Sequence, residues 1–226
     1  QYETSSGFTT SELFVGVGTS GTILSSPEGT NWTQRTSSVS TYLQDVTYGN
    51  GLFVTVGGYN CGNCGFILTS TSGKEWTSRT SGTNVLLSYV TYGKNQFVVV
   101  GSSGTILTSS DGITWTSRTS GTTNILYGGV TYGNQIFITS GISGIILTSS
   151  DGITWTSRTS GTSSNLYGMT FGGNLFVIVG ASGTILTSSD GITWTSRTSG
   201  TTKNLYETTY GNDYFLAVGS SGTILT

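Results

Sequence analysis

Residues 104–122 read GTILTSSDGITWTSRTSGT, and residues 183–201 repeat this stretch without a change. Residues 144–162 differ from both only by Ile145 in place of Thr. The tryptophan of this stretch recurs along the chain at spacings of 44, 39, 40 and 39 residues, at Trp32, Trp76, Trp115, Trp155 and Trp194. A fixed period of about 40 residues is typical of repeat architectures. The near-identity of three copies indicates recent duplication of one unit.

An apolar run precedes each of these copies and predicts a buried strand. The runs are LFVTV from Leu52, QFVVV from Gln96, QIFIT from Gln135, LFVIV from Leu175 and YFLAV from Tyr214. They do not alternate, which is expected when neighbours cover both faces of a sheet. A turn rich in Gly and Asn stands before each run and predicts a hairpin. The fourth unit therefore contains four strands, at 126–133, 136–139, 145–149 and 154–160.

Four-stranded antiparallel units of 39–44 residues, with no helix signal, predict an all-β fold, a β-propeller of about six blades. The predicted blades of this single domain are 1–38, 39–82, 83–121, 122–161, 162–200 and a partial, three-stranded blade at 201–226. The segment QYETSSG from Gln1 matches LYETTYG from Leu205 as a first strand. We expect the first strands to line the axis, where Gly128, Gly129 and Gly168 let backbones approach closely.

The block TSSDGITW resembles the Asp-box of the bacterial neuraminidase repeat, which occurs in sialidases, in sortilin-like receptors and in photosystem assembly factors of the Ycf48 type. Asp111, Asp151 and Asp190 stand four rather than five positions before their Trp, so the box is shortened by one residue. Eroded copies stand at residues 27–29 and 72–74. The resemblance implies a propeller hairpin between the third and fourth strands, but it implies no single activity, because the box occurs on unrelated functions. We interpret the three carboxylates as turn-forming, structural residues.

Composition excludes several kinds of chemistry. The chain contains no His, which removes imidazole bases and His-ligated metals, and we expect no metal and no cofactor. Eight Lys and Arg against ten Asp and Glu make nucleic acid an unfavourable partner. No apolar window reaches the length of a membrane-spanning helix, and no signal segment opens the chain. The expected protein is soluble and not an enzyme.

The most informative polar residues follow each Trp by three positions: Arg35, Arg79, Arg118, Arg158 and Arg197. An odd separation on a strand puts Arg and Trp on opposite faces. The Arg of one blade and the Trp of its neighbour could therefore share a groove between blades, where a planar guanidinium suits a carboxylate or vicinal hydroxyls. The alternative is that the five Trp form inter-blade core and that each Arg stacks on an aromatic ring and bonds to carbonyls.

Two cysteines, Cys61 and Cys64, lie in an insertion within the second blade. A redox CxxC pair would need a helix start to lower the thiol pKa, and two cysteines are too few for structural zinc. A local disulfide is the better interpretation, and it predicts an oxidising location, extracellular or at the cell surface, with the periplasm as a further possibility.

Three function classes follow. The first is a non-catalytic binding or scaffolding propeller, a multivalent adhesion protein or surface-assembly subunit, whose partners are other protein chains or surface glycans. A lectin with inter-blade sites is the alternative. A sialidase-like glycosidase is disfavoured because all five Arg occupy one repeat position and the residues that vary between blades read as turn residues and conservative core swaps. An assembly factor of the Ycf48 type would need a more basic surface.

The end of the last blade has a predicted consequence. The third strand at 222–226 leaves backbone donors and acceptors unpaired at an outer edge, which is a template for strand addition or self-association. Either a neighbouring chain or further sequence beyond Thr226 supplies the missing strand, or the three-stranded blade stays bare with this edge in water.

Overall fold

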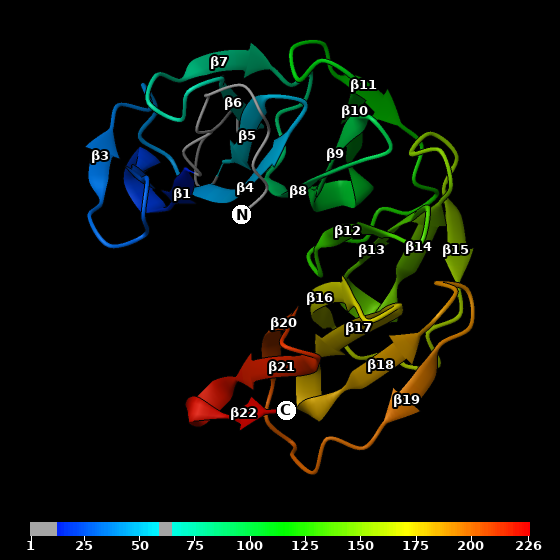
Figure 1. Cartoon of the computed structure of the whole chain (residues 1–226). Helices are drawn as coiled ribbons and strands as arrows, with labels where there is room; N and C mark the ends of the chain where they lie inside the picture. The colour runs from blue at the N-terminus through cyan, green and yellow to red at the C-terminus, as the bar shows by residue number, and fades with distance from the viewer. Residues whose placement is uncertain (1–12, 59–64) are drawn as a thin grey trace, which may run out of the picture.

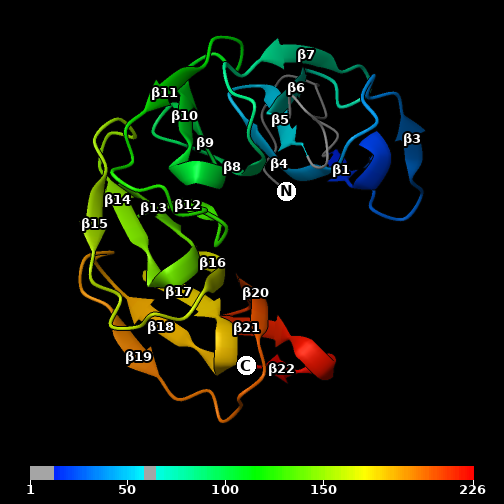
Figure 2. The ribbon, with the colours of Figure 1, turned by 180° about the vertical axis from the view of Figure 1, so that it is seen from behind.

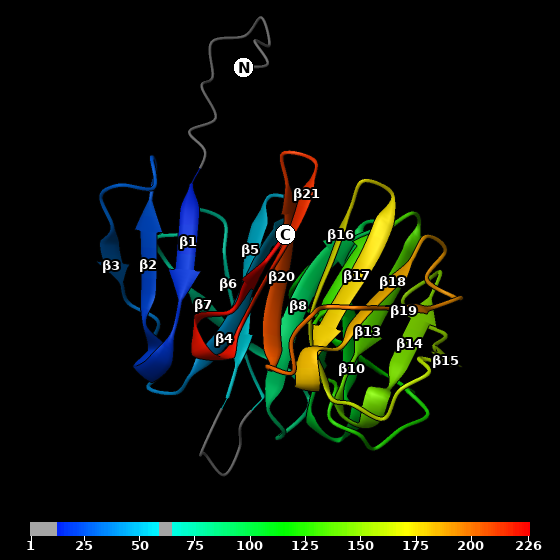
Figure 3. The same ribbon diagram turned by 90° about the horizontal axis from the view of Figure 1, so that it is seen from below.

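The computed structural model describes residues 13–58 and 65–226, which form six antiparallel sheets. Each sheet is one blade, and the blades follow one another along an arc (Figures 1 and 2). In Figure 3 the strands run through the thickness of the arc, so the turns gather on its two rims. Blades 2 to 5 have four strands, whereas blades 1 and 6 have three among the described residues.

The second and third strands of the blades form the middle of each sheet. The second strands are β1 (Phe14–Val17), β5 (Leu52–Gly57), β9 (Gln96–Gly101), β13 (Ile136–Ser140), β17 (Leu175–Gly180) and β21 (Tyr214–Gly219). The third strands are β2 (Ile23–Ser26), β6 (Phe66–Ser70), β10 (Ile106–Ser109), β14 (Ile146–Ser149), β18 (Ile185–Ser188) and β22 (Ile224–Leu225).

The first strands lie on the inner side of the arc and the fourth strands on its outer side (Figure 1). The first strands are β4 (Leu43–Gly49), β8 (Leu87–Gly93), β12 (Val130–Gly133), β16 (Leu166–Gly172) and β20 (Leu205–Gly211). The fourth strands are β3 (Thr33–Arg35), β7 (Thr77–Thr80), β11 (Thr116–Arg118), β15 (Thr156–Arg158) and β19 (Thr195–Arg197).

Two kinds of turn connect the strands. The predicted hairpin between first and second strands has two residues with positive φ, for example Asn134 at 46° and Gln135 at 63°, as a tight hairpin of right-handed twist requires. In blades 1, 3, 4, 5 and 6 the link from second to third strand is a short 3₁₀ turn, where the sequence predicted an ordinary hairpin. The five turns are η1 (Thr19–Gly21), η2 (Ser102–Gly104), η3 (Ile142–Gly144), η4 (Ala181–Gly183) and η5 (Ser220–Gly222).

Apolar side chains of neighbouring blades meet at each interface and form the core. Between blades 4 and 5, Ile138 and Ile146 pack with Phe176, Ile178 and Leu186, and each of these five is at most 1% exposed. Equivalent clusters recur at the other interfaces. The second strands of blades 2 to 5 are therefore buried on both faces, as their unbroken apolar sequence predicts.

Polar side chains add a clamp between blades. Lys94, in the hairpin turn of blade 3, donates a hydrogen bond to the carbonyl oxygen of Ser150 in blade 4 at 2.9 Å. Gln96 donates to the carbonyl oxygen of Asp151 at 2.7 Å. Asn134 of blade 4 donates a hydrogen bond to the carbonyl oxygen of Ser189 in blade 5 at 3.2 Å. The hairpins of blades 3 and 4 thus hold the Asp-box turns of blades 4 and 5.

Blades 1 and 6 stand apart at the two ends of the arc (Figures 1 and 2). Their outward faces expose apolar side chains: Phe14 is 46% exposed, Ile224 66% and Tyr214 69%. Strand β22 pairs with β21, and no other described strand pairs with it. The predicted open edge at the end of blade 6 is therefore present in the described part of the chain.

Some predicted elements change length. The first strand of blade 4 begins at Val130 rather than at Leu126, because Gly128 and Gly129 interrupt it. The fourth strand of that blade spans only Thr156–Arg158 instead of 154–160. The predicted first strand at 1–7 and the predicted Cys61–Cys64 disulfide lie outside the described residues. Within residues 13–58 and 65–226, no helix has the length and apolarity needed to cross a membrane.

Candidate functional site

The Asp-box carboxylates form the turn between third and fourth strands. Asp111 accepts hydrogen bonds at 2.8 Å from the backbone N–H groups of Ile113 and Thr114, and a third at 2.9 Å from the Ser109 hydroxyl. Asp151 and Asp190 make the same bonds, and the N–H donors lower the pKa of both carboxyls to about 2. These acceptors are used within their own turns, which agrees with a structural role.

The tryptophans face the blade that precedes them. Trp115 packs against a cluster that includes Val54 and Val56 of blade 2, and Trp155 packs against Val98 and Ile106 of blade 3. Each indole N–H donates to the box glycine of its own turn, at 3.0–3.3 Å, for Trp32, Trp76, Trp115, Trp155 and Trp194. Trp32, at the start of the arc, is 45% exposed.

The arginines face the following blade. Arg118 lies directly opposite Ile106 in the β10–β11 register, so both share one face, and Ile106 belongs to the cluster between blades 3 and 4. That interface also contains Trp155. Arg118 of blade 3 and Trp155 of blade 4 therefore lie on the two sides of one interface, as the opposite-face prediction requires.

Each guanidinium has the same anchor. The Nε–H of Arg118 donates at 2.8 Å to the Thr108 hydroxyl on the adjacent strand. Arg35, Arg79, Arg158 and Arg197 repeat this bond to Ser25, Thr69, Thr148 and Thr187, also at 2.8 Å. The partner is a hydroxyl rather than the carbonyl considered for the alternative. Four of the arginines are half-buried, whereas Arg197 is exposed.

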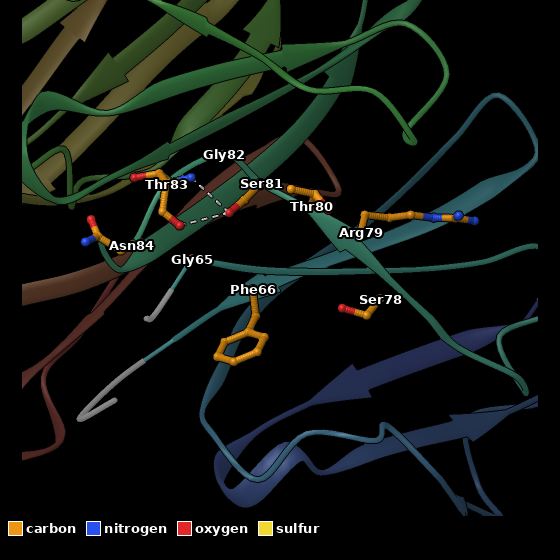
Figure 4. Close-up of a pocket in the computed structure, with 9 residues that line it drawn as sticks. All are labelled: Gly65, Phe66, Ser78, Arg79, Thr80, Ser81, Gly82, Thr83 and Asn84. Atoms are coloured by element: carbon orange, nitrogen blue, oxygen red, sulfur yellow. Dashed lines mark hydrogen bonds between the residues drawn. The ribbon is translucent and has the colours of Figure 1, made fainter. Parts of the chain in front are cut away.

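A hollow open to solvent lies beside two of these arginines. In blade 2 it has a volume of about 590 Å³ and is lined by Arg79, Ser81, Thr83 and the adjoining turn (Figure 4). Ser81 accepts from the Thr83 N–H and donates to its carbonyl oxygen, which fixes the wall of the hollow. Figure 4 shows the Arg79 guanidinium extending away from this wall. The corresponding hollow beside Arg35 in blade 1 measures about 680 Å³.

The inner strands carry a second set of polar groups that the sequence analysis missed. Asp45 on β4 accepts from the backbone N–H of Val46 at 2.8 Å and from that of Val90 on β8 at 2.9 Å. Burial nevertheless raises the pKa of its carboxyl to about 6, and the charge of Glu207 on β20 adds to the effect. Burial also raises the pKa of Glu207. Both carboxyls stand far in the fold from the outer strands that hold the arginines (Figure 1).

These carboxyls correct the expectation that only turn residues and conservative core residues vary between blades. One position of the first strand holds Asp45, Tyr89, Gly168 and Glu207 in blades 2, 3, 5 and 6, and the pair Gly128–Gly129 fills it in blade 4, where the strand segment has one residue more. A β-bulge precedes this position in blades 2, 3, 5 and 6 and redirects its side chain. Aligning the first strands would have revealed the variation.

The glycines at this position permit close packing of inner strands. A Cβ added to Gly168 would lie 2.7 Å from Cα of Glu207, and one added to Gly128 would lie 2.7 Å from the carbonyl oxygen of Leu166. No real Cβ approaches backbone so closely. Within the described ranges, no group of three or more metal-ligating side chains comes together.

No family model and no curated protein matches the sequence. Solved structures do match the fold. "YCF48 bound to D1 peptide" is 16% identical with a TM-score of 0.72, over 93% of this chain and 72% of that one. YCF48 from Cyanidioschyzon merolae is 15% identical with a TM-score of 0.67, over 94% and 78%. The chain has a β-propeller fold. The computationally designed Ika8 protein, 14% identical, also matches, with a TM-score of 0.69, over 96% of this chain and 68% of that one.

Proposed function

We propose that this protein is a non-catalytic β-propeller that binds other polypeptides through the repeated arginines of its outer strands, two of which border hollows. The observation that carries the proposal is the identical Nε anchor of Arg35, Arg79, Arg118, Arg158 and Arg197. Five equivalent groups held in one geometry favour multivalent binding over chemistry at one centre.

The guanidinium chemistry suits a carboxylate partner. Among the described residues each arginine donates only through Nε, so its two terminal nitrogens keep their N–H groups for a ligand. A planar pair of such donors matches a carboxylate in bidentate geometry, whereas a lysine offers only a point charge. The preferred partner is therefore a polypeptide with exposed Asp or Glu side chains.

The comparison with YCF48 supports a polypeptide ligand, because that propeller was solved with a D1 peptide bound. At 16% identity the likeness extends to the fold, and the ligand class is our inference. A lectin remains the alternative, since vicinal hydroxyls of a sugar also accept from a guanidinium.

A glycosidase is disfavoured by position. Asp45 and Glu207, the carboxyls whose pKa is raised by burial, lie on inner strands, whereas the arginines lie on outer strands. A glycosidase needs its acid, nucleophile and substrate clamp around one sugar ring.

We further propose an extracellular or cell-surface location, as a multivalent adhesion protein or assembly subunit. The oxidation state of Cys61 and Cys64 in protein purified without reductant tests the location, and free thiols would count against it.

Binding to an immobilised Glu-rich peptide tests the function. We expect Arg118→Lys to weaken binding in part and replacement of all five arginines by Lys to abolish it, with melting temperature measured to verify folding. Lys74→Gln removes one exposed charge away from the hollows and serves as the control. Unchanged binding by the five-lysine variant contradicts the proposal. Binding to a glycan array instead of the peptide would favour the lectin, and turnover of a fluorogenic sialoside would favour the enzyme.

A further inference from the structure

The Asp-box turns of blades 3, 4 and 5 each present an exposed isoleucine at their tip. Ile113 is 52% exposed, and Ile153 and Ile192 are each 48% exposed. All three follow the box glycine, within the sequence GITW of each copy. A single exposed apolar side chain is ordinary on a protein surface. These three recur at equivalent turns, on the rim of the arc where third strands turn into fourth strands (Figure 3).

The fold does not require these isoleucine side chains. The turn of blade 3 uses the backbone N–H of Ile113, which donates to Asp111. Blade 1 holds Thr30 at the same repeat position and blade 2 holds Lys74. In both blades the box glycine still donates its N–H to a serine hydroxyl, as in blade 3. The isoleucine side chains are therefore available for a purpose other than folding.

Each tip also presents a carboxylate. The three hydrogen bonds that Asp111 accepts all end on Oδ1, and so do the three that Asp151 accepts. This geometry leaves Oδ2 of both side chains for an external donor. The turn donors also lower the pKa of both carboxyls, so that they are charged at neutral pH.

The negative charge of the tips is not cancelled by the outer strands. Hydrogen bonds lower the pKa of the three box carboxyls, and among the described residues no arginine contributes to that shift. Lys94 is a cation on the same rim, and its ammonium donates to the Ser150 carbonyl oxygen beside the blade 4 tip. Blade 2 differs, since Lys74 replaces the isoleucine and Ser72 the aspartate. In blades 3 to 5 each tip thus combines an apolar side chain with a negative charge.

We propose that these three tips form a rim surface that binds an extended polypeptide in which lysine or arginine alternates with apolar side chains. The rim surface consists of Asp111, Ile113, Asp151, Ile153, Asp190 and Ile192. The cations of the partner pair with the carboxylates, and its apolar side chains cover the isoleucines. Contacts at three equivalent tips add through avidity.

Charge complementarity selects this occupant. The carboxylates repel anionic lipid headgroups and nucleic acid, and they attract lysine and arginine side chains. The exposed isoleucines favour a partner that also brings apolar side chains. The rim surface goes beyond the proposed function, because it lies on turns rather than on the outer strands and takes a ligand of the opposite charge.

The test uses the 226-residue chain and a fluorescent peptide in which the unit Lys-Leu-Gly is repeated. We expect saturable binding by fluorescence anisotropy. Repeats of Lys-Ser-Gly keep only the charge and repeats of Ser-Leu-Gly keep only the apolar side chains, so each should bind about tenfold more weakly. No binding of the Lys-Leu-Gly peptide, or equal affinity of either control peptide, would overturn the proposal.

A triple variant locates the surface. Ile113→Thr, Ile153→Thr and Ile192→Thr together install the residue that blade 1 holds at this position, so the turns should form as in the parent. Binding of the Lys-Leu-Gly peptide should fall about tenfold. Ile145→Thr is the matched control, because it makes the same chemical change on the opposite rim, next to η3, and gives blade 4 the residue of blades 3 and 5. Unchanged binding by the triple variant, or a loss in the control, overturns the assigned location.

The carboxylates are tested by replacing Asp111, Asp151 and Asp190 with Asn, which keeps an oxygen acceptor for each turn and removes the charge. Binding of the Lys-Leu-Gly peptide should fall about tenfold, whereas that of the Ser-Leu-Gly peptide should stay the same. Melting temperature verifies that the variant is folded. Unchanged binding of the Lys-Leu-Gly peptide would overturn the proposal.

The Glu-rich probe separates this inference from the proposed function. The triple isoleucine variant should bind that probe as the parent does, and the variant with five lysines in place of the arginines should still bind the Lys-Leu-Gly peptide. Failure of the Glu-rich probe alone rejects the arginine sites and leaves the rim surface in place. Failure of the Lys-Leu-Gly peptide alone rejects the rim surface and leaves the proposed function in place.

Discussion

Asp45 should make the folded protein less stable as pH rises from 4 to 7. Burial raises the pKa of its carboxyl from the ordinary 3.8 to about 6. The folded state therefore holds this proton more tightly than the unfolded state, and the stabilisation is complete below about pH 4 and is lost as pH passes 6. A shift of about two units, at about 1.4 kcal/mol per unit, corresponds to a loss of about 3 kcal/mol.

Urea denaturation of the parent and of Asp45→Asn at pH 4, 5, 6 and 7 measures this effect. The difference between their free energies of unfolding should move by about 3 kcal/mol in favour of the variant across this range. Glu207 titrates in both proteins, so only its coupling to Asp45 remains in the difference. Asp190→Asn is the control and should run parallel to the parent from pH 4 to 7, because the lowered pKa of that carboxyl makes its contribution disappear only as pH falls below 4. Parallel pH profiles for parent and Asp45→Asn would refute the reasoning.

Three further predictions concern packing. Gly133→Ala places a Cβ 2.3 Å from the Phe171 ring and should lower the free energy of unfolding by about 1–3 kcal/mol in urea denaturation. Gly211 holds the same repeat position with no atom within 4 Å of an added Cβ, so Gly211→Ala is the control and should be close to neutral. Thr208→Val removes a buried hydroxyl that has no hydrogen-bond partner among residues 13–58 and 65–226, and it should raise the melting temperature; a decrease would contradict this. Trp155→Ala should lower the free energy of unfolding by about 3 kcal/mol in chemical denaturation. A loss below about 1 kcal/mol would show that the packing of this indole between blades contributes little.

The repeat made the fold predictable. Trp spacing gave the period, and unbroken runs such as that from Gln96 to Gly101 identified the strands that neighbours cover on both faces. The hairpin turns followed from Gly and Asn, whose positive φ is a local property. The 3₁₀ turns were missed because a serine such as Ser103, at φ 55°, carries no comparable signal.

The candidate site was less predictable, because its properties depend on contacts between blades. The alternation of strand faces predicted that Arg118 and Trp155 belong to one interface, but not that a Thr108 hydroxyl would hold the guanidinium. The pKa of Asp45 depends on burial against β8, which its own strand does not reveal.

The clamp from the hairpin turns of blades 3 and 4 to the next Asp-box has a consequence for how such chains change over generations. Lys94 with Ser150 and Asn134 with Ser189 join different pairs of blades in the same way, and the apolar clusters beneath them also match. A gene that gains or loses one 40-residue copy therefore recreates an existing junction between blades instead of requiring a new one. The free energy of unfolding then changes by the contribution of one blade and of one interface between neighbouring blades. Copy number, rather than new interface chemistry, then sets how far the arc extends.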